Sequence, residues 1–132
     1  MNSSERTETG KAFIWIDDEG ILHLKLNEGA EIDLKEVEKH FSIYKDLRLQ
    51  KHKALQLFEG GAFFAFNSDA MKYVANNGSD FFIASAIVNN SLAIRILFGF
   101  FKKFFDQSFP FEMFGTKGEA LKWLRTQKKV SK

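Results

Sequence analysis

Hydrophobic positions along the chain recur at two different spacings, which predict short strands alternating with helices. Two-residue alternation, bounded by turn residues, predicts five strands at residues 12–16, 21–26, 53–58, 81–88 and 109–114. Recurrence every three to four residues predicts four helices, one after Asp33, two at 69–75 and 92–105, and one after Thr116. The pattern indicates one domain of alternating elements, without an internal repeat or linker.

Polar residues typical of helix caps stand before the predicted helices. Asp33 with Glu36, and Thr116 with Glu119, match the capping box, in which each residue of the pair satisfies a backbone N–H group near the other. Ser68 is expected to cap the second helix through its hydroxyl. These caps fix where three of the four helices are expected to begin.

The predicted order of elements is β-β-α-β-α-β-α-β-α. After the initial hairpin, strands alternate with helices, which is typical of crossover connections between parallel strands. Polar side chains such as Lys25 and Gln56 stand on the outward side of the second and third strands, so helices are expected to cover mainly one face. The sequence thus predicts an α/β fold class, a mixed sheet of about five strands with four helices mainly on one face.

Three runs in the C-terminal half carry a resemblance to a known family. They are residues 84–91 (ASAIVNNS), 109–114 (FPFEMF) and 119–124 (EALKWL). The last run resembles the F-x(3–5)-E-A-x-x-W-L close of many single-domain STAS-like chains. Together with the element order, residues 12–127 resemble the STAS domain (sulfate transporter and anti-sigma-factor antagonist) and its small stand-alone bacterial relatives, which are sometimes grouped with Sec14-type lipid-binding folds. The resemblance implies an anti-sigma-factor-antagonist-like fold and a non-enzymatic regulatory or interaction module.

The resemblance also implies a position for a regulatory serine. In anti-sigma-factor antagonists, a phosphorylatable serine stands at the start of the second helix within Asp-Ser-Ser/Thr-Gly. The matching residues 67–70 here are NSDA, so Ser68 has the position but neither the preceding aspartate nor the following glycine. The alternative is that Ser68 is a helix cap only. The first functional hypothesis is a partner-binding surface or phosphosite formed by Asn67, Ser68, Asn89, Asn90 and Ser91.

The third predicted helix is apolar around most of its circumference. Its polar positions fall on one narrow stripe, formed by Arg95, Gly99, Lys102 and Asp106. A helix that lies on a sheet needs an apolar stripe only about 100° wide. The additional apolar flank is therefore expected to meet neighbouring helices, a second copy of the chain in a homodimer, an apolar ligand or a lipid surface.

The second functional hypothesis follows from this helix. It is an apolar-ligand or lipid-binding domain that uses the flank of Phe98, Phe101 and Phe105. Arg95 and Lys102 would then be placed to meet an anionic headgroup. Aromatic residues at core spacing do not form an exposed stacking surface, so nucleic acid is not an expected partner.

Composition narrows the classes further. The 132 residues include no cysteine, which excludes disulfides and cysteine metal sites and suits a cytoplasmic location. The formal net charge of +2 is too even for a nucleic-acid binder. The longest apolar region, residues 81–105, is interrupted by polar and charged residues, so no membrane span is expected. We expect a disordered leader at 1–10, the STAS-like domain at 11–127 and a basic tail at 128–132.

Side chains suited to catalysis or metal binding are sparse. His23, His40 and His52 have no partner at metal-ligand spacing and are expected on the surface. The acidic turn at 17–19 lacks the ligand spacing of a calcium loop, and no serine stands in a nucleophile elbow. The sequence therefore predicts no catalytic residue, no metal site and no cofactor.

Overall fold

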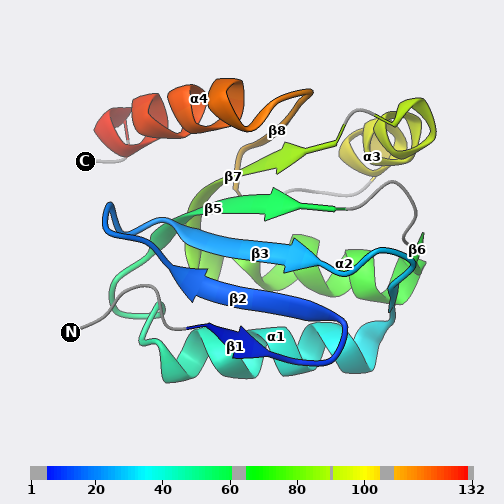
Figure 1. The fold of residues 1–132 in the computed structure, drawn as a ribbon, viewed down its shortest axis with the longest axis horizontal. Helices are drawn as coiled ribbons and strands as arrows, with labels where there is room; N and C mark the ends of the chain where they lie inside the picture. Colours follow the sequence, from blue (N-terminus) through cyan, green and yellow to red (C-terminus); the bar gives the residue numbers. More distant parts are fainter. Residues whose placement is uncertain (1–5, 61–64, 90, 105–108, 131–132) are drawn as a thin grey trace.

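A six-stranded mixed sheet forms the centre of the computed structural model, which describes residues 6–60, 65–89, 91–104 and 109–130 (Figure 1). In their order across the sheet, the strands are β1 (Thr7–Glu8), β2 (Ala12–Ile16), β3 (Leu22–Leu26), β5 (Ala54–Glu59), β7 (Phe82–Val88) and β8 (Phe111–Phe114). The first three strands pair antiparallel, and β3, β5, β7 and β8 pair parallel. A separate parallel pair joins β4 (Glu31–Ile32) to β6 (Ala65–Phe66). The predicted hairpin and parallel crossovers are therefore present.

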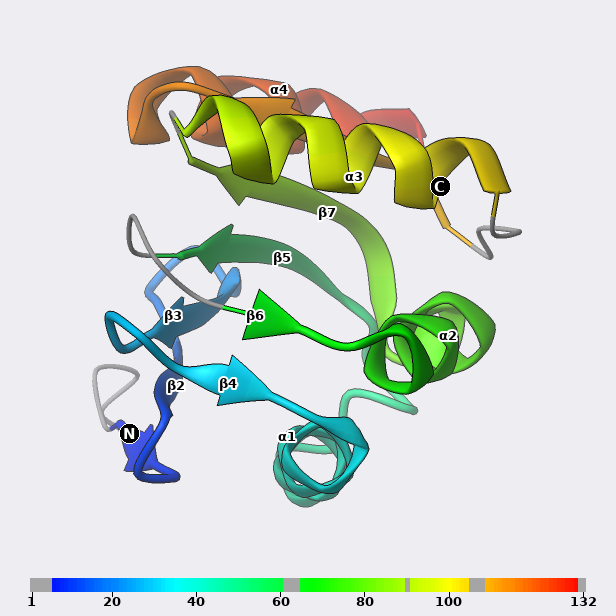
Figure 2. The same ribbon diagram turned by 90° about the vertical axis from the view of Figure 1, so that its right-hand side faces the viewer.

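Four α-helices surround the sheet: α1 (Leu34–Asp46), α2 (Ser68–Asn77), α3 (Leu92–Phe104) and α4 (Lys117–Val130). A short 3-10 helix, Gly78–Asp80, follows α2. Helices α1 and α2 cover one face of the sheet, α4 covers the opposite face, and α3 lies beyond the carboxyl end of β7 (Figures 1 and 2). The expectation that helices lie mainly on one face is corrected by the position of α4.

Alternation along β5 explains why both faces are covered. Leu55 and Leu57 belong to the hydrophobic cluster beneath α4, whereas Phe58 belongs to the cluster beneath α1 and α2. Gln56 was expected to face solvent, but it is buried on the α2 side. A polar residue in a strand usually indicates that this face of the sheet is exposed to solvent. Gln56 therefore led to the prediction of one exposed face, although both faces are buried.

Aromatic rings fill much of the space between the sheet and the first two helices. The ring of Phe41 lies 5.2 Å from Tyr44, 5.1 Å from Tyr73 and 5.2 Å from Phe81, measured between centroids. The last two contacts are edge-to-face, an arrangement that aromatic quadrupoles favour. Phenylalanine is abundant in this chain partly because this core is built from rings.

Caps begin the helices largely where the sequence predicts them. The Asp33 side chain accepts a hydrogen bond from the Glu36 backbone N–H at 2.9 Å, and the Thr116 hydroxyl accepts one from the Glu119 N–H at 3.2 Å. At α2 the cap is one residue earlier than predicted. The Asn67 side chain accepts from the Ala70 N–H at 2.9 Å, and Ser68 is already the first helical residue. The capping role expected of Ser68 thus belongs to Asn67.

The ordered elements extend past both expected domain boundaries. Strand β1 lies before residue 11, because Thr7 pairs with Ile14 and Glu8 with Phe13. The guanidinium of Arg6 lies 4.1 Å from the centroid of the Trp15 ring. At the other end, α4 continues through residues 128–130, which were expected to form a tail.

Two of the three histidines are buried, contrary to the surface positions expected for them. His23 stacks on Trp15 with centroids 4.6 Å apart, and its Nε2 donates to Asp17 Oδ2 at 2.8 Å. His40 Nε2 donates to Glu36 Oε2 at 2.7 Å. Carboxylate partners make this burial tolerable, because they satisfy a polar ring atom that would otherwise lose its hydration. Only His52 is exposed.

The buried His40 should make stability depend on pH. Burial lowers the pKa of His40 below its ordinary 6.5, and the hydrogen bond to Glu36 offsets only part of that effect. The folded chain therefore binds fewer protons at this site than the unfolded chain, so its contribution to stability is present above about pH 6.5 and is lost as the pH falls through the folded-state pKa.

We expect the free energy of unfolding to fall on acidification through this range. His40→Gln should flatten part of that dependence, which urea denaturation over a pH series measures. His52→Gln is the matched control at an exposed histidine and should leave the dependence unchanged. A His40→Gln profile parallel to that of the wild type would contradict the prediction.

Candidate functional site

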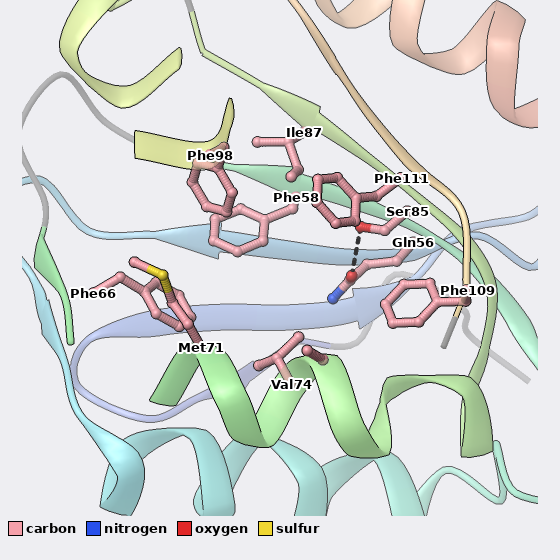
Figure 3. Close-up of a pocket in the computed structure, with 11 residues that line it drawn as sticks. Gln56, Phe58, Phe66, Met71, Val74, Ser85, Ile87, Phe98, Phe109 and Phe111 are labelled. Atoms are coloured by element: carbon pink, nitrogen blue, oxygen red, sulfur yellow. Dashed lines mark hydrogen bonds between the residues drawn. The ribbon is translucent and has the colours of Figure 1, made fainter. Parts of the chain in front are cut away.

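An apolar cavity of about 40 Å³ lies between the sheet and helices α2 and α3 (Figure 3). Strands β5, β7 and β8 supply one wall, α2 supplies the other, and α3 contributes Phe98. The lining residues are Gln56, Phe58, Phe66, Met71, Val74, Ala75, Ser85, Ile87, Phe98, Phe109 and Phe111.

Periodicity places these side chains around the cavity. On β5 and β7, residues two apart point to the same face, so Gln56 and Phe58 line the cavity beside Ser85 and Ile87. On α2 the lining residues Met71, Val74 and Ala75 are three and four positions apart, which places them on one side of the helix.

Three phenylalanine rings enclose one side of the cavity. The centroids of Phe58 and Phe66 lie 6.3 Å apart, and Phe98 lies 6.3 Å from Phe58 and 6.5 Å from Phe66. These residues come from β5, β6 and α3, so the rings join three elements. Phe66 and Val74 are only half-buried, so the lining reaches toward the surface.

A short chain of polar groups forms the floor of this otherwise apolar cavity. The Ser85 hydroxyl donates to Gln56 Oε1 at 2.8 Å, and Gln56 Nε2 donates to the Tyr44 hydroxyl at 3.4 Å. Gln56 and Ser85 are only 6% and 4% exposed. Burial raises the pKa of Tyr44, so its hydroxyl stays neutral. The floor therefore offers neutral hydrogen-bonding groups and no charge.

Phe109 closes the cavity beside the 3-10 helix. A Cβ atom on Gly78 would overlap the Phe109 ring, so this approach requires glycine. The ring of Phe109 also lies 6.3 Å from that of Phe82, measured between centroids. Glycine at this position therefore lets an aromatic ring reach the end of the cavity.

Helix α3 places large apolar side chains on the surface as well as in the cavity. Ile94 and Phe98 are buried on its inner side. On its outer side, Leu92, Ile96 and Phe100 are 72%, 54% and 58% exposed. These three residues, spaced four apart, form a single line along the helix, which we call the α3 ridge.

The second hypothesis placed Phe98, Phe101 and Phe105 on one flank with Arg95 and Lys102. Phe98 is buried; the Phe101 side chain and Phe105 lie outside the described residues. Arg95 and Lys102 line a groove between α3 and β8 together with Glu112, and Lys102 Nζ lies 2.9 Å from Glu112 Oε2. Lys102 is thus paired with a carboxylate of the chain itself, and the lipid interpretation is not favoured.

The residues of the predicted partner surface lie at the starts of α2 and α3. Asn67 and Ser68 are exposed, Asn90 lies outside the described residues, and Ser91 is half-buried. Asn89 is buried instead; its side chain accepts from the Ser91 N–H at 2.8 Å and donates to the Gly60 carbonyl at 3.3 Å. Asn89 thus holds two loops together. Of the four described residues in this set, Asn67, Ser68 and Ser91 have side chains that solvent reaches.

Within the parts of the chain that the structure describes, no three histidine, cysteine or carboxylate residues gather in an arrangement that would hold a metal. In the same residues, no helix combines the length and apolar character needed to cross a membrane.

Sequence reasoning missed the floor of the cavity. Gln56 interrupts the otherwise apolar run ALQLF at residues 54–58, and Ser85 stands between two alanines in the central strand β7. One signal was available, because parallel strands with both faces covered are nearly continuous in hydrophobicity. A polar residue in each of two such neighbouring strands indicates a pair of side chains that meet.

The chain was compared with protein families, curated proteins and solved structures. The model of a family described as "Domain of unknown function (DUF7793)" matches residues 14–128. No curated protein matches the chain. Among solved structures, the chain is similar to an uncharacterized protein of the DUF3478 family from Shewanella loihica PV-4, which has a SpoIIAA-like fold.

The two chains are 16% identical, the match covers 94% of this chain and 98% of the other, and the TM-score is 0.54. At this identity the likeness concerns the fold alone. It confirms the α/β fold class and the STAS-like fold that the sequence predicts.

Proposed function

The chain belongs to the DUF7793 family, and from that premise we propose that it is a non-enzymatic regulatory module that holds a protein partner on the α3 ridge. The observation that carries the proposal is the exposure of Leu92, Ile96 and Phe100. Full burial of one such side chain contributes about 1.5–3 kcal/mol. A partner that covers the ridge therefore gains considerable binding free energy from three residues.

The charge of α3 selects the chemistry of that partner. The helix carries three cations, Arg95, Lys102 and Lys103, and no acidic residue. Glu112 pairs with one of them, Lys102, so positive charge remains in excess beside the ridge. A second copy of the chain would bring the same cations against these residues, which disfavours a homodimer through α3. The complementary occupant is a segment with apolar residues at helical spacing and an acidic flank.

Two further observations support a binding role. The STAS-like fold implies a protein-binding switch by resemblance, and helix α3 lies at the carboxyl edge of the parallel strands, where open α/β sheets commonly bind their ligands (Figure 2). Among the described residues, the cavity lining offers an amide and a hydroxyl but no base that would activate the hydroxyl. Phosphorylation of Ser68, which is exposed in the first turn of α2, stays a prediction.

Photo-crosslinking in the cells that make this protein tests the proposal. Benzoylphenylalanine at Ile96 should crosslink one protein through a segment that is apolar and acidic. The same group at Lys72, an exposed position on α2, should not crosslink that protein. Crosslinks only to lipid, only to a second copy of this chain, or equally from both positions would overturn the proposal.

A synthetic peptide of the crosslinked segment then gives an affinity. Ile96→Glu should weaken peptide binding at least about tenfold. The new carboxylate would be buried against the apolar residues of the peptide and repelled by its acidic flank. Lys72→Glu makes a comparable change of charge away from the ridge and should leave binding unchanged. Fluorescence anisotropy measures both variants. Equal affinities for wild type and Ile96→Glu would show that the ridge is not the contact.

A further inference from the structure

We infer that the cavity above α2 is a binding site for a small, neutral, apolar molecule with one carbonyl oxygen. Gln56 carries the inference. Its side chain has two N–H groups, but among the described residues Nε2 makes one hydrogen bond, to Tyr44 at 3.4 Å. Burying an amide N–H in apolar surroundings without an acceptor is energetically unfavourable. The same position would be filled by leucine at no such cost.

Ser85 fixes the direction in which the amide points. Because its hydroxyl donates to Gln56 Oε1 at 2.8 Å, the amide nitrogen is turned the other way. In Figure 3 that nitrogen points toward the interior of the cavity, between the side chains of α2 and Phe109. The floor therefore presents a hydrogen-bond donor, and the group that it recognises is an acceptor oxygen.

The lining specifies the rest of the molecule. No charged side chain is among the described residues that line the cavity, so a carboxylate would be buried without a partner, which is strongly unfavourable. A neutral ketone, ester, lactone or amide carbonyl meets the donor without that cost. The volume of about 40 Å³ is several times what one water needs. Water would find few polar partners here, since it usually makes about three hydrogen bonds in buried sites.

Three compounds of the same shape, each of four non-hydrogen atoms, separate these requirements and suit a cavity of about 40 Å³. Acetone has the carbonyl, 2-methylpropene replaces the oxygen with CH₂, and acetate carries a charge. In an NMR titration of the whole chain, acetone should shift the side-chain amide resonances of Gln56 and the methyl resonances of Met71, Val74 and Ile87. It should bind about threefold to tenfold more tightly than 2-methylpropene, the expected effect of one hydrogen bond.

Variants identify the group that recognises the carbonyl. Gln56→Leu should make acetone and 2-methylpropene bind equally, whereas Gln50→Leu, the same change at an exposed position, should preserve the difference. Val74→Phe should fill the cavity from a half-buried position, so that ligand no longer shifts the Gln56 amide resonances or the methyl resonances of the lining. This variant tests the site even if Gln56→Leu does not fold.

Several outcomes would overturn the inference. Absence of shifts at the lining methyl groups would mean that the cavity binds none of these molecules. Equal affinity of the wild-type chain for the ketone and the alkene would mean that the cavity is an apolar void that does not recognise a carbonyl oxygen. Tighter binding of the carboxylate would contradict the neutral class, and unchanged binding by Val74→Phe would place the compound elsewhere. None of these results bears on the α3 ridge, because the inference does not depend on a partner there.

Discussion

Replacing Phe41 with alanine is expected to lower the free energy of unfolding by about 3–5 kcal/mol. The Phe41 ring is buried and contacts the rings of Tyr44, Tyr73 and Phe81 at centroid distances of 5.1–5.2 Å. Truncation removes the hydrophobic transfer energy of the ring, leaves a cavity among residues held by three elements, and breaks two edge-to-face contacts.

Urea denaturation followed by circular dichroism measures this loss. Ser42→Ala, an exposed neighbour on α1, should change the midpoint little. Phe41→Leu keeps most of the volume and should cost clearly less than alanine. A loss below about 1 kcal/mol for Phe41→Ala would mean that the surrounding rings close the space, and that the cluster is more adaptable than its edge-to-face geometry indicates.

The fold was predictable because its determinants are local. Alternation in Leu22, Leu24 and Leu26 locates β3 without knowledge of its neighbours, and Asp33 marks the start of α1 by a hydrogen bond three residues away. The short strands β1, β4 and β6 were not predicted, because each has two residues and too few positions to show a period. Their pairing is decided by the tertiary fold.

The candidate site was less predictable, because it depends on contacts between distant residues. Gln56 and Ser85 are 29 positions apart, and nothing local shows that they meet. The histidines illustrate the same limit. His40 has Glu36 one helical turn away, which the sequence shows, but burial of the pair depends on Thr9 from the N-terminal segment, which donates to the same carboxylate at 2.6 Å.

Helix α3 has one feature that the sequence predicted and one that it did not. Its excess of apolar residues was visible in the sequence, but which of them face inward was not. The sequence argument placed Phe98 on an outer flank, whereas the structure turns Phe98 into the cavity and exposes Ile96. The direction of a helix face is set by the strand that precedes it and by the elements it meets, and periodicity alone leaves that rotation open.

A matched pair of leucines tests the distinction between core and ridge. Leu57→Ala is expected to lower the free energy of unfolding by about 2–5 kcal/mol, because Leu57 is 0% exposed in β5 beneath α4. Leu92→Ala makes the same chemical change at a side chain that is 72% exposed. It should alter stability by no more than about 0.5 kcal/mol, since alanine is at least as good a helix former as leucine.

Denaturation of both variants under the same conditions gives the comparison. If Leu92→Ala destabilises the chain as much as Leu57→Ala, its side chain is covered in solution by another part of the chain or by a second copy, and the α3 ridge is not a docking surface. If Leu92→Ala is neutral for stability yet weakens binding of the crosslinked peptide, folding does not explain this large exposed side chain. The Leu92 side chain is then buried only when a partner binds.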